Sequence, residues 1–103
     1  MQNGKLRVLK DGTKKYWLGR KHHRIDGPAI EWISGDKEWY VNDQLHRLDG
    51  PACERADGSK FWALNGKYHR IDGPAVEWAS GSKEWWIDGI KQDAAGTGFV
   101  NSD

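Results

Sequence analysis

The chain has 103 residues, a net charge of +1, seven Trp and one Cys. A single cysteine excludes an internal disulfide framework and a thiolate metal cluster, and we expect Cys53 to be a buried thiol. No apolar run is long enough to cross a bilayer, and the first residues lack the apolar core of a secretory signal. We therefore expect one cytoplasmic domain without membrane association.

Pairs of short segments rich in aromatic and β-branched residues follow one another along the chain. Each pair is interrupted by an Asp-Gly or Ser-Gly turn, and such turns favour hairpins because Gly accepts positive φ. No segment has apolar residues at helical spacing, and a Gly or Pro interrupts every ten or so residues. The sequence predicts an all-β fold with strand pairs 6–10 with 14–18, 29–33 with 37–41, 52–56 with 60–64, and 75–79 with 83–87.

The motif His-Arg-x-Asp-Gly-Pro-Ala occurs at 23–29, 46–52 and 69–75, with a constant offset of 23 residues. A fixed period of this length is typical of repeat proteins, in which one supersecondary unit stacks on its copies. The units are about 6–22, 23–45, 46–68 and 69–91. We expect residues 1–91 to form a single elongated, curved antiparallel β-meander of four stacked hairpin repeats, and 92–103 to be a flexible tail.

Strand alternation also predicts the two faces of the sheet. In the second unit we expect Ile30 and Trp32 to share the buried face with Trp39. Glu38 and Tyr40 should then lie on the opposite face, together with the equivalent residues of the other units.

The repeated motif has a structural and a functional interpretation. In the structural one, the carboxylates accept backbone N–H groups in the turn, His or Arg bridges to the adjacent unit, and the apolar residue at the variable position packs in the loop. The residues concerned are His23, Asp26, His46, Asp49, His69 and Asp72, with Ile25, Leu48 and Ile71 at the variable position. In the functional interpretation, the arginines hold phosphate or carboxylate groups of a small anion or nucleotide. These are Arg24, Arg47 and Arg70.

No sequence pattern indicates catalysis. A nucleophile elbow, a phosphate-binding glycine loop and a zinc-protease motif are all missing. Three of the four histidines belong to different units, which a stack would separate by about 10 Å, too far to share one metal ion. We expect a protein that is not an enzyme and has no catalytic residues, no metal and no cofactor.

Aromatic residues on the face opposite the predicted core are candidates for contacts with a protein partner, because Trp and Tyr contribute most to interface energies. The candidates are Trp17, Tyr40, Tyr68 and Trp86. A nucleic-acid partner is less favoured, since the glutamates expected on the same face would repel phosphates.

Charge is distributed unevenly along the chain. Residues 1–24 contain eight Lys/Arg and one Asp, giving +7, whereas 25–103 contain eight Lys/Arg and fourteen Asp/Glu, giving −6. Opposite potentials at the two ends of a stack, together with open sheet edges, would permit a homodimer or a self-assembling structural element.

The unit from Asn65-Gly66-Lys67 through Trp85-Trp86-Ile87-Asp88-Gly89 resembles the MORN (membrane occupation and recognition nexus) repeat, also a 23-residue β-hairpin with an Asn-Gly-Lys turn. His-Arg-x-Asp-Gly-Pro-Ala stands where that family usually has His-Gly-x-Gly, and this variant is similar to repeats in small phage and bacterial proteins. The resemblance implies an elongated sheet that binds protein partners or, in some members, acidic phospholipids. Our leading hypothesis is a non-catalytic protein-binding module, such as a phage-encoded inhibitor of a host defence protein.

Overall fold

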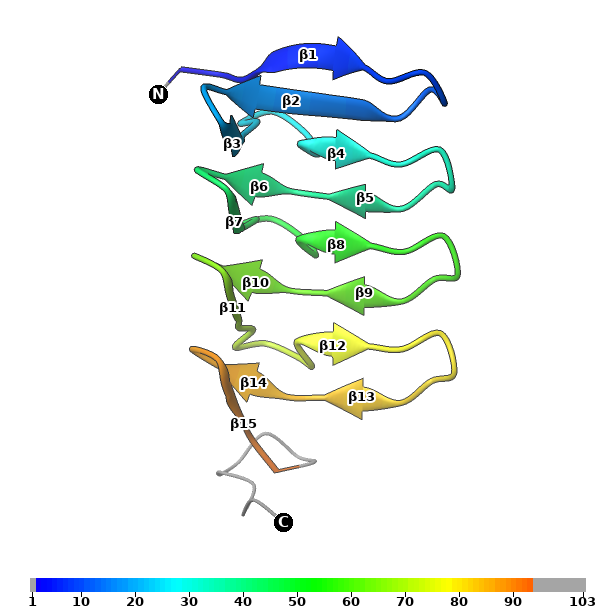
Figure 1. Ribbon diagram of the computed structural model, residues 1–103. Helices are drawn as coiled ribbons and strands as arrows, with labels where there is room; N and C mark the ends of the chain where they lie inside the picture. The colour runs from blue at the N-terminus through cyan, green and yellow to red at the C-terminus, as the bar shows by residue number, and fades with distance from the viewer. Residues whose placement is uncertain (1, 94–103) are drawn as a thin grey trace.

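The computed structural model describes residues 2–93, in which every regular element is a β-strand (Figure 1). No helix able to span a bilayer occurs among these residues. The all-β prediction is confirmed for this part of the chain. The strands are β1 (Lys5–Val8), β2 (Lys14–Leu18), β3 (Lys21–His22), β4 (Ile30–Glu31), β5 (Lys37–Glu38), β6 (Tyr40–Val41), β7 (Gln44–Leu45), β8 (Cys53–Glu54), β9 (Lys60–Phe61), β10 (Ala63–Leu64), β11 (Lys67–Tyr68), β12 (Val76–Glu77), β13 (Lys83–Glu84), β14 (Trp86–Ile87) and β15 (Ile90–Lys91).

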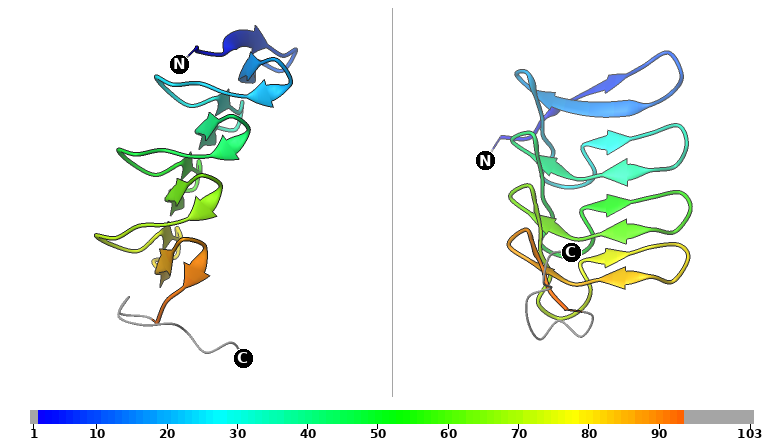
Figure 2. Two further views of the ribbon diagram at one scale, coloured as in Figure 1. Left: turned by 90° about the vertical axis from the view of Figure 1, so that its left-hand side faces the viewer. Right: turned by 60° about the horizontal axis from the view of Figure 1, so that its bottom comes forward.

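Each hairpin lies beside the next hairpin in the chain. The main sheet has the order β1-β2-β4-β5-β8-β9-β12-β13, with β3 paired to β2. Ile30 pairs with Glu38 inside one hairpin, and Glu38 pairs with Cys53 of the next. Figures 1 and 2 show the units stacked in one column. The predicted meander of stacked hairpin repeats is therefore confirmed.

Two different turns shape each unit. At the first, the Trp32 N–H donates to the Asp36 carbonyl and the Gly35 N–H donates to the Trp32 carbonyl, both at 2.9 Å, with Gly35 at φ +100°. This is a three-residue loop whose last residue needs a left-handed conformation. At the second, Asn42 and Asp43 both have positive φ, 51° and 66°, as a type I′ turn requires.

The second turn leads into strands that the sequence analysis did not predict. These strands, β7, β11 and β15, pair with β6, β10 and β14 in two-stranded sheets. The chain then continues into the His-Arg-x-Asp-Gly-Pro segment, which connects one hairpin to the next (Figure 1). Each repeat therefore ends in a second, smaller hairpin that places this segment beside the main sheet.

The face assignment from strand alternation was wrong for the second strand of each hairpin. Ile30 stands directly opposite Glu38, and the Trp32 indole N–H donates to the Glu38 carboxylate at 3.2 Å. Glu38 and Tyr40 therefore share the face of Ile30, while Trp39 lies on the other face. The three-residue loop causes this arrangement. With an odd number of loop residues, even-numbered residues of one strand stand opposite even-numbered residues of the next, and residues that stand opposite each other share a face.

The buried cluster lies on the face of Ile30. Cys53, Phe61 and Val76 form its centre, each at most 5% exposed, and Leu45 and Trp86 pack against them. Cys53 is buried as predicted. The three alanines that close the repeated motif are completely buried: Ala29, Ala52 and Ala75.

Of the predicted flexible tail, residues 92–103, only 92 and 93 belong to the described residues, and 94–103 lie outside them. Gln92 belongs to the ordered repeat. Its side chain is buried, and its N–H donates to the Trp85 carbonyl at 2.7 Å. The equivalent bond in the preceding unit runs from His69 to Trp62.

Candidate functional site

The arginine of each repeated motif is held by its own loop and by the sheet. Arg47 Nε donates to Asp49 Oδ1 at 3.1 Å, and Nη1 donates to the Pro51 carbonyl at 3.1 Å and to Glu54 Oε2 at 3.2 Å. The guanidinium carbon lies 4.0 Å from the centre of the Trp39 ring, a cation–π contact. Arg24 on Tyr16 and Arg70 on Trp62 repeat the arrangement.

These contacts explain why glycine follows the aspartate. A Cβ at Gly50 would lie 2.9 Å from Arg47 Cζ, which is closer than real Cβ contacts. Gly27 and Gly73 are in the same position relative to their own arginines. The glycine therefore makes room for the guanidinium, which lies across the backbone of its own loop.

The histidines link the two ends of their own unit; the contact between adjacent units that the structural interpretation assigned to His or Arg is made by the arginines, as with Arg47 on Trp39. His46 Nδ1 accepts the N–H of Asn65, in the second turn of the same unit, at 2.9 Å. His23 does the same for Asn42, and His69 for Asp88, both at 3.0 Å. An Nδ1 that accepts a hydrogen bond leaves the ring proton on Nε2. These histidines thus set the distance between the motif loop and the second turn of the same unit.

The aspartates do not have the predicted role. The interactions of Asp49 and Asp72 are with arginine Nε atoms rather than with backbone N–H groups. Asp26 accepts the side chains of Arg24 and Asn3, and the Arg24 hydrogen bond is the largest cause of its lowered pKa. Because arginine already occupies the centre of the loop, each carboxylate binds it with one oxygen.

Arg24, Arg47 and Arg70 are brought to equivalent places, but not as free cations. Each forms an ion pair with an aspartate and with a glutamate, and their side chains are 19–23% exposed. An anion arriving at one of these guanidinium groups would compete with two carboxylates. The geometry therefore favours the structural interpretation of the arginines over anion binding.

The residue at the variable position of the motif projects into solvent. Ile25 is 51% exposed, and Leu48 and Ile71 are each 83% exposed. The expectation that this residue packs in its loop was therefore wrong. Every other residue type in the motif has a contact or a turn that accounts for it. We call Ile25, Leu48 and Ile71 the loop ladder.

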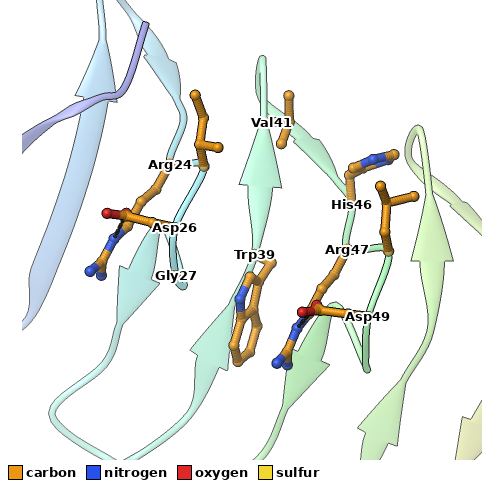
Figure 3. A pocket seen from close by; sticks show the side chains of 10 residues that line it. Arg24, Asp26, Gly27, Trp39, Val41, His46, Arg47 and Asp49 are labelled. Atoms are coloured by element: carbon orange, nitrogen blue, oxygen red, sulfur yellow. Dashed lines mark hydrogen bonds and ion pairs between the residues drawn. The ribbon is translucent and has the colours of Figure 1, made fainter. Parts of the chain in front are cut away.

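A groove lies between each pair of neighbouring loops. The first, of about 850 Å³, has Trp39 and Val41 between the loops that carry Ile25 and Leu48. The second, of about 700 Å³, has Trp62 and Leu64 between the next two loops. Figure 3 shows the Trp39 ring between the loop of Arg24 and the loop of Arg47. The ladder and its grooves form one continuous surface that repeats with the period of the fold.

Two polar features border these grooves. Within residues 2–93, the indole N–H groups of Trp39 and Trp62 have no hydrogen-bond partner in the protein, whereas those of Trp32, Trp78 and Trp86 donate to glutamates. The side chains of the groove aspartates, Asp49 and Asp72, are each 87% exposed. The grooves therefore combine apolar surface with an available donor and exposed negative charge.

The aromatic residues predicted to contact a partner lie on the other face, around the buried cluster. Tyr68 packs edge-on against Trp86 with ring centres 5.5 Å apart, and His22 lies between Trp17 and Tyr40 at 4.0 and 5.6 Å. Only Tyr68, at 37%, is among the exposed large side chains. Burial raises the pKa of Tyr40 to about 12. These four residues mainly contribute to packing in this structure.

Among the described residues, no group of three or more His, Cys, Asp or Glu side chains is arranged to hold a metal ion. Burial also raises the pKa of the Cys53 thiol to about 11, which disfavours the reactive thiolate.

Comparisons with known proteins found no matching family model, no similar curated protein and no similar solved structure. The function proposed below therefore rests on the geometry of this chain.

Proposed function

We propose that this protein is a non-catalytic repeat module that binds a protein partner through the loop ladder and its grooves. The observation that carries the proposal is the exposure of Ile25, Leu48 and Ile71 at equivalent positions. A row of exposed apolar side chains beside aromatic grooves is typical of surfaces that bury area on association.

The repeat itself supports this choice over other exposed positions. Ile33 is 68% exposed, but alanine occupies the equivalent positions 56 and 79. Trp32 and Trp78 are also partly exposed, yet their indole N–H groups bond to Glu38 and Glu84. Within residues 2–93, only the ladder places an exposed apolar side chain at the same position of each of the three motifs.

A partner-capture experiment tests the proposal. Tagged wild-type protein is compared with the double variant Leu48→Ser/Ile71→Ser and with the control Ile33→Ser, using lysate of the native host. We expect the wild type and the control to capture the same protein from the lysate, and the double variant to capture much less of it. Equal capture by all three would refute the ladder as the binding surface.

The same experiment addresses the more specific hypothesis of a host-directed inhibitor. If the captured protein belongs to a host defence system, adding the module should inhibit its activity, and the double variant should not. We also propose that the chain is a MORN-like repeat protein, on the basis of its 23-residue hairpin unit.

A further inference from the structure

We propose that the partner segment is a basic, proline-rich peptide in the polyproline II conformation, lying along the loop ladder across both grooves. This inference rests on the proposed function, because it specifies the ligand of the same surface. Three independent features of the grooves support it: their spacing, their unpaired indole donors and their charge.

The spacing of the grooves matches a polyproline II helix. Equivalent residues of neighbouring units are separated by two strand spacings, about 9.6 Å. A polyproline II helix repeats every three residues with a rise of about 3.1 Å each, so one turn is about 9.3 Å. One residue in three would therefore enter successive grooves beside Trp39 and Trp62.

Other regular peptides fit the grooves less well. An extended strand presents residues to one face every 6.6–6.8 Å or so, well short of the groove spacing. Seven residues of an α-helix span about 10.5 Å, nearer to the spacing, but the helix uses its backbone carbonyls internally. A polyproline II segment has no internal hydrogen bonds, so its carbonyl oxygens are free to accept.

The available donors are suited to such carbonyls. The indole N–H groups of Trp39 and Trp62 have no hydrogen-bond partner within the described residues, and both residues line the grooves. In Figure 3 the indole nitrogen of Trp39 is on the side of the Arg24 loop, toward the space between the two loops. Aromatic grooves are a general means of binding proline-rich segments, because their rings contact the flat pyrrolidine.

The charge at the rim favours basic residues in the peptide. Asp49 and Asp72 bind their arginines through Oδ1 and are otherwise exposed. The adjacent arginines are covered by two carboxylates each, so the exposed charge of these loops is negative. An Arg or Lys of the peptide, placed once per turn, would meet one aspartate in each loop.

Synthetic peptides test the inference on the intact chain. The probe is a peptide of three Pro-Pro-Arg triplets, and the controls are three Gly-Gly-Arg triplets, which keep the charge, and a helical Leu/Lys peptide of equal charge. Binding is followed by heteronuclear NMR of the tryptophan indole groups, which are assigned by single Trp→Phe variants. We expect the Pro-Pro-Arg peptide to bind and to shift the indole signals of Trp39 and Trp62 but not that of Trp32.

Variants then separate the contributions. Trp39→Phe keeps a ring beneath Arg47 but removes the donor, so affinity should fall about three- to tenfold, the usual effect of one hydrogen bond. Leu48→Ser/Ile71→Ser should weaken binding by tenfold or more, whereas Ile33→Ser should leave it unchanged.

Three results would overturn the inference: binding of the Gly-Gly-Arg peptide as tight as that of Pro-Pro-Arg, tighter binding of the helical peptide, or no shift of the Trp39 and Trp62 signals. If these occur while the ladder variant still loses the captured partner, the peptide class is wrong and the proposed function stands. Capture that is insensitive to the ladder variant would instead refute the proposed function.

Discussion

Replacing Arg47 by alanine should destabilise the protein strongly, because the side chain connects a loop to the sheet beneath it. The stack over the Trp39 ring at 4.0 Å contributes about 0.5–2 kcal/mol. The hydrogen bond to the Pro51 carbonyl adds about 0.5–1.5 kcal/mol. The partly exposed pair with Glu54 adds about 0.2–1 kcal/mol, and the solvent-exposed pair with Asp49 adds little.

The expected loss of unfolding free energy for Arg47→Ala is therefore about 3 kcal/mol, or about 12–24 °C in Tm for a domain of this size. The measurement is thermal and urea unfolding followed by tryptophan fluorescence. Arg47→Lys should recover less than half of the loss, because an ammonium group lacks the planar stack and the fork of donors. Arg20→Ala is the matched control: Arg20 is exposed, its side chain makes no hydrogen bond or ion pair within the described residues, and the change should alter stability by at most about 0.5 kcal/mol.

If Arg47→Ala were no more destabilising than Arg20→Ala, the structural role of the motif arginine would be refuted. The anion hypothesis is tested with the same assay. Because each motif arginine is already paired with carboxylates, we expect nucleotides and inorganic phosphate to leave the Tm of the wild type unchanged. A rise in Tm that Arg47→Ala abolishes would restore the anion site.

Three further outcomes follow from the turns and from the shifted pKa values. Gly58→Ala should cost about 1–2 kcal/mol in urea unfolding from backbone strain alone, since Gly58 has φ +98° and no atom near its absent Cβ; an unchanged midpoint would contradict the turn geometry. Cys53, whose pKa is raised to about 11 from 9.0, should resist alkylation at pH 8 until urea unfolds the chain, and rapid labelling of the native protein would refute its burial. The contribution of the protonated thiol to stability is present below pH 9 and should be lost as pH rises through 11. The Ser59 backbone N–H lowers the pKa of Asp57 below 3.8. The contribution of the Asp57 carboxylate to stability is therefore present above that pH and is lost as pH falls through its folded-state pKa. Asp57→Asn should flatten this part of the pH–stability curve, and an unchanged curve would argue against the turn contact.

The sequence alone predicted the features that depend on local chemistry. The 23-residue period located the hairpins, and the Gly-containing turns located their ends, because positive φ restricts the residues that a tight turn accepts. The contact of the motif arginine with the preceding unit, seen for Arg47 on Trp39, also followed from the repeat, since identical positions in a stack meet identical neighbours.

The faces of the sheet could not be obtained by counting alternate residues. Ile30 would share a face with Trp39 only if the turn between them had an even number of residues, and the loop that forms has three. A change of one residue in a loop moves every side chain of the following strand to the other face. This is also why the candidates Tyr40 and Trp86 lie around the buried cluster rather than on the face opposite to it.

The loop ladder was missed for a different reason. An apolar residue between Arg and Asp is compatible with a packed loop or with an exposed one, and only the path of the backbone distinguishes them. The loop is filled by the Arg47 guanidinium, which lies over Gly50 and binds the Pro51 carbonyl, so Leu48 has no space inside it. No sequence signal short of this geometry indicates that the apolar side chain points outward.

The motif divides its residues between folding and recognition, and the division has a consequence for specificity. The Arg, Gly and Ala of each loop are fixed by contacts whose loss costs stability, whereas Leu48 and Ile71 are 83% exposed and contribute little to folding. Exchanging the ladder residue therefore changes the groove walls with little effect on the scaffold. Because each groove has one ladder residue on either side, substituting the central Leu48 alters both grooves at once, while Ile25 and Ile71 each alter one. Binding that depends on the two grooves together should accordingly be more sensitive to Leu48→Ser than to Ile71→Ser, although the two side chains are equally exposed.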